Sequence, residues 1–426
     1  MNCKIFWGIV LVFFILVGLV SQTPASISFS GNSAMSDSKL IASEVGISQL
    51  VEANNRFSFN LFSQLLARTS PPQNIFISPQ SIAIAFTTIR NGTEGETLAE
   101  IDRTLELELD AAKIDSGYRK LIEILTTADP SIKLAIANSL WVNQNIELKD
   151  EFIDRAQDFY RSKVTNLDFA DPSAPQTIDR WVASNTAYKI LEIVDSVSPE
   201  NVLYLINAIY FQGDWANKFD PSQTTEQPFF SNSQTSTVAM MSQTGEYRYY
   251  ANEQFQAVRL PYGEQKEIGM YIFLPQTNSS LEQLNQQLNI DNWQEWLSQM
   301  RSQRGNISLP KFKLEYDTEL KDVLSVLGMQ RVFNPTQANF SAMTDTSVAI
   351  DTVKHKAVIE VDEKGTEAAG VTSIGIRITS AMPENQPFNF TVDRPFFFAI
   401  EDDITETILF MGNVVEPGME AVGKRQ

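Results

Sequence analysis

A run of small residues follows directly after a predicted β-strand near the end of the sequence, and it limits the possible folds more than any other feature. The strand is predicted over residues 353–361, where branched residues are frequent. The small residues occupy positions 363–372 and include the flexible Gly365 near their start. Soluble proteins rarely place so little side-chain bulk beside a buried strand without a structural reason.

The small residues follow the two-residue period of a strand. Four small and uncharged residues share one face: Thr366, Ala368, Gly370 and Thr372. This face fits into a packed sheet, whereas the face that carries Glu367 and Ala369 is expected to stay in solvent. The pattern predicts a spare strand held outside its sheet. The alternative is a surface loop of small residues.

The overall charge narrows the range of partners. The chain has 426 residues and a formal charge of -19, from 33 Lys and Arg against 52 Asp and Glu. This acidic balance argues against nucleic acid or an anionic membrane as the main partner. The hydrophobic fraction of 43% is enough for a substantial core.

The N-terminus has the pattern of a secretory signal peptide, predicted over residues 1–25. Lys4 precedes an apolar run at residues 5–20, and small residues follow it. We therefore expect a secreted protein, extracellular or periplasmic. The alternative is an uncleaved membrane anchor formed by residues 5–20. The single Cys3 lies before the run, so the mature chain would contain no disulfide.

The rest of the chain is organised as one domain, predicted over residues 46–418. Residues 26–45 are rich in serine and are expected to form a flexible lead, and residues 419–426 a loose tail. Helical spacing is found at residues 47–69 and 151–160, and buried strands are expected at residues 134–142, 203–211, 268–274, 396–400 and 407–410. Helices are expected mainly in the first half of the chain and strands in the second, and no repeat or internal linker is found. This pattern predicts a single α+β domain with large sheets.

Several short motifs occur in an order that resembles the serpins, a family of suicide protease inhibitors. The resemblance extends from about residue 47 to Pro417, and each motif alone is weak. The motifs lie at residues 74–81, 134–142, 207–215, 260–262, 309–312, 327–329, 393–396 and 410–414. The resemblance implies one serpin domain with large mixed β-sheets, about nine helices and an exposed reactive loop.

The resemblance also implies three groups of site residues. The shutter, which controls opening of the main sheet, comprises Ser78, Ser81, Asn207 and His355. The breach, where strand insertion begins, comprises Lys311, Trp215 and Glu363. The hinge of the reactive loop comprises Glu363, Gly365, Thr366, Ala368, Ala369, Gly370 and Thr372. His355 is the only histidine of the chain, and its neutral ring can donate one hydrogen bond and accept another.

The resemblance implies inhibition of a serine protease by a suicide mechanism. The protease would attack the loop as a substrate and form an acyl-enzyme, and the freed hinge would then insert into the main sheet. Counting from the hinge glycine puts the reactive bond at Thr379–Ser380, which suits an elastase-like or subtilisin-like protease. Arg377–Ile378 is the alternative bond and would suit a trypsin-like enzyme. We expect a monomer without cofactor or metal.

Other functions are less well supported by the sequence. One histidine and no cysteine in the mature chain exclude a cysteine protease and argue against a histidine-rich metal site. No G-x-S-x-G motif or phosphate-binding loop is present, so the chain is not expected to be an enzyme. The main alternative is a non-inhibitory serpin that acts as a carrier, storage protein or chaperone, and a second is an exported hydrolase.

Overall fold

The computed structural model describes residues 45–418, except residue 71, residues 232–233 and residues 367–385. Nine α-helices lie within these residues: α2 (Val45–Arg68), α3 (Pro79–Arg90), α4 (Gly95–Thr104), α5 (Ala111–Thr127), α6 (Asp150–Tyr160), α7 (Ala174–Asn185), α8 (Leu281–Asn285), α9 (Ile290–Gln299) and α10 (Lys321–Leu327). Two 3-10 helices are η1 (Pro221–Gln223) and η2 (Arg331–Phe333). The predicted α+β class is confirmed.

The strands of the described residues form two sheets. The six-stranded sheet has the order β10 (Phe312–Glu319), β11 (Thr352–Val361), β12 (Gly365–Thr366), β4 (Leu203–Asp214), β2 (Ile132–Asn143) and β3 (Lys163–Leu167). The nine-stranded sheet has the order β1 (Ile75–Ile77), β15 (Thr407–Val414), β14 (Phe396–Asp402), β8 (Ile268–Pro275), β7 (Phe255–Pro261), β6 (Thr235–Ala251), β9 (Arg301–Pro310) and β13 (Phe388–Thr391), with β5 (Thr225–Phe230) paired to β6. The predicted strands are present, most of them a few residues longer than expected.

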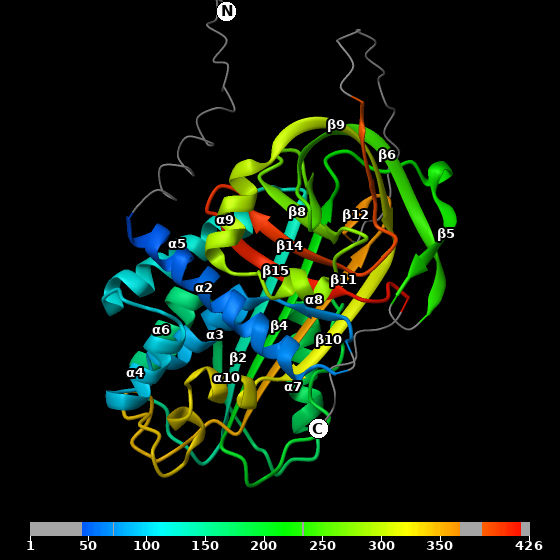
Figure 1. Ribbon diagram of the computed structural model, residues 1–426. Coiled ribbons are helices and arrows are strands. Elements are labelled where there is room, and N and C mark those ends of the chain that lie inside the picture. Colours follow the sequence, from blue (N-terminus) through cyan, green and yellow to red (C-terminus); the bar gives the residue numbers. More distant parts are fainter. Residues whose placement is uncertain (1–44, 71, 232–233, 367–385, 419–426) are drawn as a thin grey trace, which may run out of the picture.

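The middle of the six-stranded sheet is formed by two parallel strands that separate at one end. β4 and β11 pair directly from Tyr204 opposite Thr352 to Tyr210 opposite Val358. Beyond this point the short strand β12 lies between them, antiparallel to both. Figure 1 shows β12 at the end of β11. The sheet is therefore closed along most of its length and divided at one end.

Both faces of this sheet are covered, which explains the continuous apolar run of β4. Its residues Leu203–Phe211 are all buried. α3 packs against one face, where Ser78 caps the helix and Pro79 opens it. α7 and the segment that follows it cover the other face and form a second apolar core with Trp141, Tyr204 and Val358. In Figure 1 helices α2 to α6 gather to one side of the long strands.

The strand β13 is fixed to the nine-stranded sheet by an aromatic contact. Phe388 stacks on Tyr249 with ring centroids 3.8 Å apart and an interplanar angle of 10°. The ring passes so close to Gly305 that a Cβ at that position would lie 2.2 Å from it. β13 also pairs in parallel with β9 from Phe388 to Thr391. β13, the first strand described after β12, is therefore firmly packed in the nine-stranded sheet.

The turn after α7 contains two consecutive non-glycine residues in the left-handed region, Ala187 with φ 51° and Tyr188 with φ 60°. This conformation costs an L-residue about 1–2 kcal/mol. The Tyr188 ring is 70% exposed, so it contributes little burial in return.

Replacing Tyr188 with glycine should therefore stabilise the protein. We expect Tyr188→Gly to raise the free energy of unfolding by about 1 kcal/mol, because glycine adopts this conformation without the clash of a Cβ atom. Chemical denaturation of both proteins measures the difference. Tyr188→Ala is the matched control, since it removes the ring but keeps Cβ and should give no gain. An equal gain for both variants would contradict the explanation by backbone strain.

Candidate functional site

The four residues of the shutter lie in one buried hydrogen-bond network beneath the six-stranded sheet. His355 on β11 and Asn207 on β4 are opposite each other in the parallel register, and their Nδ1 and Oδ1 atoms are 2.5 Å apart. Asn207 Nδ2 donates to Ser81 Oγ at 2.5 Å. The backbone N–H of Ser78 donates to His355 Nε2 at 3.3 Å. The network thus joins β4, β11 and the start of α3.

These contacts determine the protonation of His355. Its Nε2 accepts a hydrogen bond from a backbone N–H, so the ring proton lies on Nδ1 and is donated to Asn207. The ring is fully buried, and this burial lowers the pKa of His355 to about 3. The imidazole is therefore neutral at physiological pH. In this state it uses one nitrogen as donor and the other as acceptor.

A fifth residue of the shutter, Asn138 on β2, was not predicted from the sequence. Asn207 Nδ2 also donates to Asn138 Oδ1, and Asn138 Nδ2 donates to the carbonyl of Ser81 at 3.3 Å. Asn138 lies directly opposite Asn207 in the antiparallel register and is 2% exposed. A signal was present, since an asparagine within a buried strand needs hydrogen-bond partners.

The breach residues meet at the divided end of the sheet. Lys311 Nζ lies 2.9 Å from Glu363 Oε2, and Thr224 Oγ1 donates to Glu363 Oε1 at 2.8 Å. The Trp215 indole N–H donates to the carbonyl of Asp362 at 2.9 Å. Thr224 is a further partner that was not predicted as part of the breach. Although partial burial acts to raise the pKa of Glu363, the hydrogen bonds from Lys311 and Thr224 hold it below its usual value.

Two of the hinge residues already lie within the six-stranded sheet. Gly365 pairs with Asp214, and Thr366 pairs with Gly213 on one side and Val361 on the other. Gly365 has φ 155°, and a Cβ there would lie 2.2 Å from the carbonyl oxygen of Gly213. Only glycine fits at this position. The hinge residues Ala368, Ala369, Gly370 and Thr372 and both predicted reactive bonds, Thr379–Ser380 and Arg377–Ile378, lie outside the described residues.

The side chain of Lys356, the residue after His355, forms its contacts on the face of the sheet opposite to that of His355. Its Nζ donates to the carbonyl of Glu192 at 2.8 Å and lies 2.6 Å from Glu315 Oε1. Glu192 belongs to the segment that follows α7, which Asp179 holds through the N–H groups of Ile193 and Val194. β11 is thus tied to α3 on one face and to the segment after α7 on the other.

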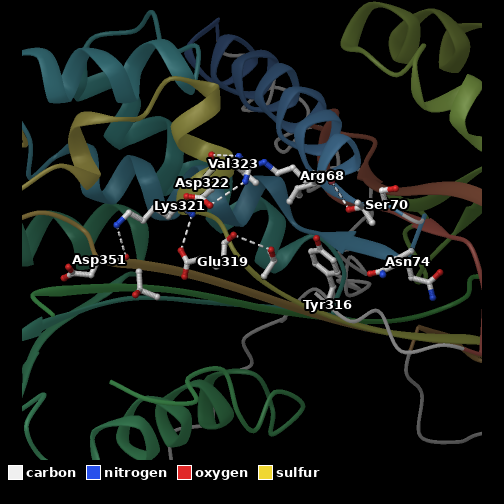
Figure 2. A pocket seen from close by; sticks show the side chains of 14 residues that line it. Arg68, Ser70, Asn74, Tyr316, Glu319, Lys321, Asp322, Val323 and Asp351 are labelled. Carbon is white, nitrogen blue, oxygen red and sulfur yellow. Dashed lines mark hydrogen bonds and ion pairs between the residues drawn. The ribbon is translucent and has the colours of Figure 1, made fainter. Parts of the chain in front are cut away.

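A pocket of about 500 Å³ among the described residues lies away from the shutter and the breach. Figure 2 shows it between the end of α2, α10 and the start of β11. Its charged groups bond within the protein: Arg68 donates to the carbonyl of Asp322, and Glu319 accepts the N–H groups of Lys321 and Val353. These internal bonds leave few charges for a ligand.

The described residues show neither a metal site nor a helix that could span a membrane. They contain no group of His, Cys, Asp and Glu side chains arranged to hold a metal ion. None of the helices described here combines the length and apolar character needed to cross a membrane. The apolar run at residues 5–20 lies outside the described part of the chain.

The pH dependence of stability tests the state of His355. Between about pH 6.5 and 3 the unfolded chain binds a proton at this histidine and the folded chain does not, so the folded state loses stability as the pH falls through this window. The loss amounts to about 1.4 kcal/mol per pH unit. We expect His355→Gln to remove this slope between pH 6 and 4, measured by chemical denaturation at each pH. Carboxyl groups cancel in the difference, since both proteins share them. If the free energy of unfolding of the two proteins changed with pH in parallel, His355 would already be charged in the folded state.

Comparisons with known sequences agree with the geometry of the site. The family model described as serpin (serine protease inhibitor) matches residues 52–417. An uncharacterised serpin-like protein of Thermococcus kodakarensis is 36% identical over 372 residues, which cover 86% of each chain. The leukocyte elastase inhibitor of Homo sapiens is 34% identical, covering 87% of this chain and 100% of that one.

Solved structures give the same result. Human thyroxine-binding globulin superimposes with a TM-score of 0.81 at 27% identity, covering 88% of this chain and 100% of that one. The thermophilic serpin tengpin in its native state superimposes with a TM-score of 0.79 at 29% identity, covering 86% and 94% of the two chains. The family model spans most of the sequence, and both superpositions cover most of each chain. This chain belongs to the serpin family.

Proposed function

We propose that this protein is an exported inhibitor of serine proteases that acts as a suicide substrate. Its reactive loop would be cleaved to an acyl-enzyme, and the hinge would then insert fully into the six-stranded sheet before deacylation. The observation that carries this proposal is the position of β12. Gly365 and Thr366 lie between β4 and β11 in the uncleaved chain, which supports a path of insertion that begins at this point.

The register of β12 indicates what further insertion would require. Because β12 runs antiparallel to both neighbours, each later loop residue faces one earlier residue of β4 and of β11. Position 368 would lie opposite Phe211 and Ile359, just beyond the last direct pair of the two strands. Position 372 would lie opposite Asn207 and His355. Full insertion thus requires the hydrogen bond between these two side chains to break.

The inward positions of the loop suit this path. Position 368 is alanine and position 370 is glycine, so neither brings bulk or charge beneath the sheet. Position 372 is threonine, whose hydroxyl can replace part of the hydrogen bonding that His355 and Asn207 would lose. About ten new strand residues, at roughly 0.5–1.5 kcal/mol net per hydrogen bond, would release on the order of ten kcal/mol. This energy is the proposed driving force for trapping.

The target is proposed from the reactive bond and from one relative. Thr379 at the predicted bond suits the small apolar pocket of an elastase-like or subtilisin-like protease, and a relative at 34% identity is named leukocyte elastase inhibitor. Export is proposed from the signal-like residues 5–20 alone. The alternative is a non-inhibitory carrier, because one matched structure is a thyroxine-binding globulin.

Incubation with purified elastase and subtilisin separates these functions. We expect a complex that survives boiling in detergent and is seen as a larger band on a denaturing gel. Mass spectrometry of the released C-terminal peptide then identifies the bond. A peptide that starts at Ser380 supports Thr379–Ser380, and one that starts at Ile378 supports Arg377–Ile378. Cleavage of the loop with free turnover by every serine protease, trypsin included, would exclude the inhibitory function.

The variant Thr366→Arg tests whether the hinge must enter the sheet. Thr366 is fully buried, so a guanidinium there would be an unpaired charge under the sheet at a cost of several kcal/mol. We expect the variant to be cleaved without forming a complex. Glu367→Arg is the matched control on the opposite face of the loop and should still trap the protease. Trapping by Thr366→Arg at the wild-type level would show that insertion takes another path.

Cleavage of the loop should also make the protein more resistant to heat. The cut would release the hinge to become a paired central strand, which adds hydrogen bonds that the uncut chain lacks. Melting midpoints are compared before and after limited proteolysis, and cleaved Thr366→Arg serves as the control that cannot insert. A large rise in wild type with little change in the control is expected. Equal midpoints before and after the cut would indicate a passive loop.

A further inference from the structure

Tyr262 lies beneath the point where the hinge joins the six-stranded sheet. It directly follows β7 in the nine-stranded sheet, and a β-bridge to Trp215 brings it to the end of β4. Its ring stacks on Trp215 with centroids 4.4 Å apart and an interplanar angle of 14°. The ring of Phe211 meets it edge-on at 5.1 Å. Two aromatic rings therefore fix the direction in which Tyr262 points.

The hydroxyl of Tyr262 bonds to the first threonine of the hinge. Its oxygen lies 2.6 Å from Oγ1 of Thr366, and both side chains are fully buried. The backbone of Tyr262 is held as well, since its N–H donates to the carbonyl of Ile268 at 2.8 Å. The neighbouring strand β4 also limits the position of the Tyr262 ring, because a Cβ on Gly213 would lie 3.2 Å from it. The hydroxyl thus has one fixed place below the inserted residue.

We infer that Tyr262 is a positioning residue for the hinge: its hydroxyl fixes Thr366 in register between β4 and β11 and selects a hydroxyl side chain at position 366. This inference rests on the proposed function and deepens it, since it names the contact from which insertion starts. The contact comes from a residue that follows β7 of the nine-stranded sheet and packs against the end of β4, so the receiving position is fixed relative to β4.

The bond discriminates between registers of the inserted strand. A shift by one residue would turn Thr366 to the other face of the sheet, and a shift by two would place Ala368 above Tyr262. Alanine has no hydroxyl, so the buried Tyr262 hydroxyl would lose its partner. A buried polar group without a partner is costly. The register seen for β12 is therefore the one in which both hydroxyls are paired.

Hydrogen exchange of the full-length protein tests the inference without any protease. The readout is exchange of the backbone amides in peptides that cover Trp215 and residues 362–366, because the Trp215 N–H donates to the carbonyl of Lys364. We expect Tyr262→Phe and Thr366→Val each to speed this exchange about tenfold, the loss of one buried hydrogen bond. Thr366→Ser keeps the hydroxyl and should stay near wild type. The double variant should exchange no faster than either single variant.

Tyr204→Phe is the matched control. It removes a buried tyrosine hydroxyl from the same sheet, one that accepts from Asn201 at 2.7 Å, but lies at the far end of β4 from the hinge. It should leave exchange at the hinge unchanged. The inference is overturned if Tyr262→Phe does not change exchange at the hinge, or if Tyr204→Phe changes it as much.

A parallel trapping assay separates this inference from the proposed function. If wild type traps no protease but the exchange pattern appears as expected, the inhibitory function fails and the role of Tyr262 stands. If wild type traps protease while the exchange of Tyr262→Phe matches that of wild type, the function stands and the role of Tyr262 is overturned.

Discussion

One hydrogen bond between buried side chains, from His355 to Asn207, crosses the line along which the six-stranded sheet divides. On either side of it β4 and β11 pair in parallel, and beneath it the start of α3 supplies Ser78 and Ser81. In such a low-dielectric setting, separating these groups without new partners is costly. The bond therefore holds two halves of the sheet together, and any strand that enters must offer hydrogen bonds in return.

The breach end of this dividing line differs from its middle in strand pairing and in side chains. At the breach the strands have already separated, and the space is filled by two residues without large side chains, Gly365 and Thr366. Below Tyr210 and Val358 the strands pair directly, with Lys356 adding a tie to the segment after α7. The sheet thus combines an open end with a closed and polar middle. Under the proposed mechanism, this arrangement would place the resistance to opening at the shutter, and a strand would enter at the breach.

Much of this arrangement could be predicted from the sequence, for identifiable reasons. Runs of branched apolar residues predicted β4 and β11. The order of the motifs resembled that of serpins, and this resemblance indicated His355, Asn207 and Ser78 as partners that lie far apart in the chain. The bond between Tyr262 and Thr366 could not be predicted, because neither periodicity nor composition joins two hydroxyls from different sheets. Asn138 was missed since a strand asparagine alone does not reveal its partner. β14 and β15 are longer than predicted because residues 401–402 and residues 411–414 continue the antiparallel pairing of the two strands.

The firm packing of Phe388 against Tyr249 and Gly305 bears on how many times one molecule can respond to a protease. The uncut loop is tethered at both ends, to one sheet at Thr366 and to the other at β13. Under the proposed mechanism, binding alone leaves both tethers in place, and only a cut frees one of them. Each molecule would then record a single proteolytic event and could not be reset. In a population of such molecules, the fraction that remains uncut would measure the total proteolysis to which their surroundings have been exposed.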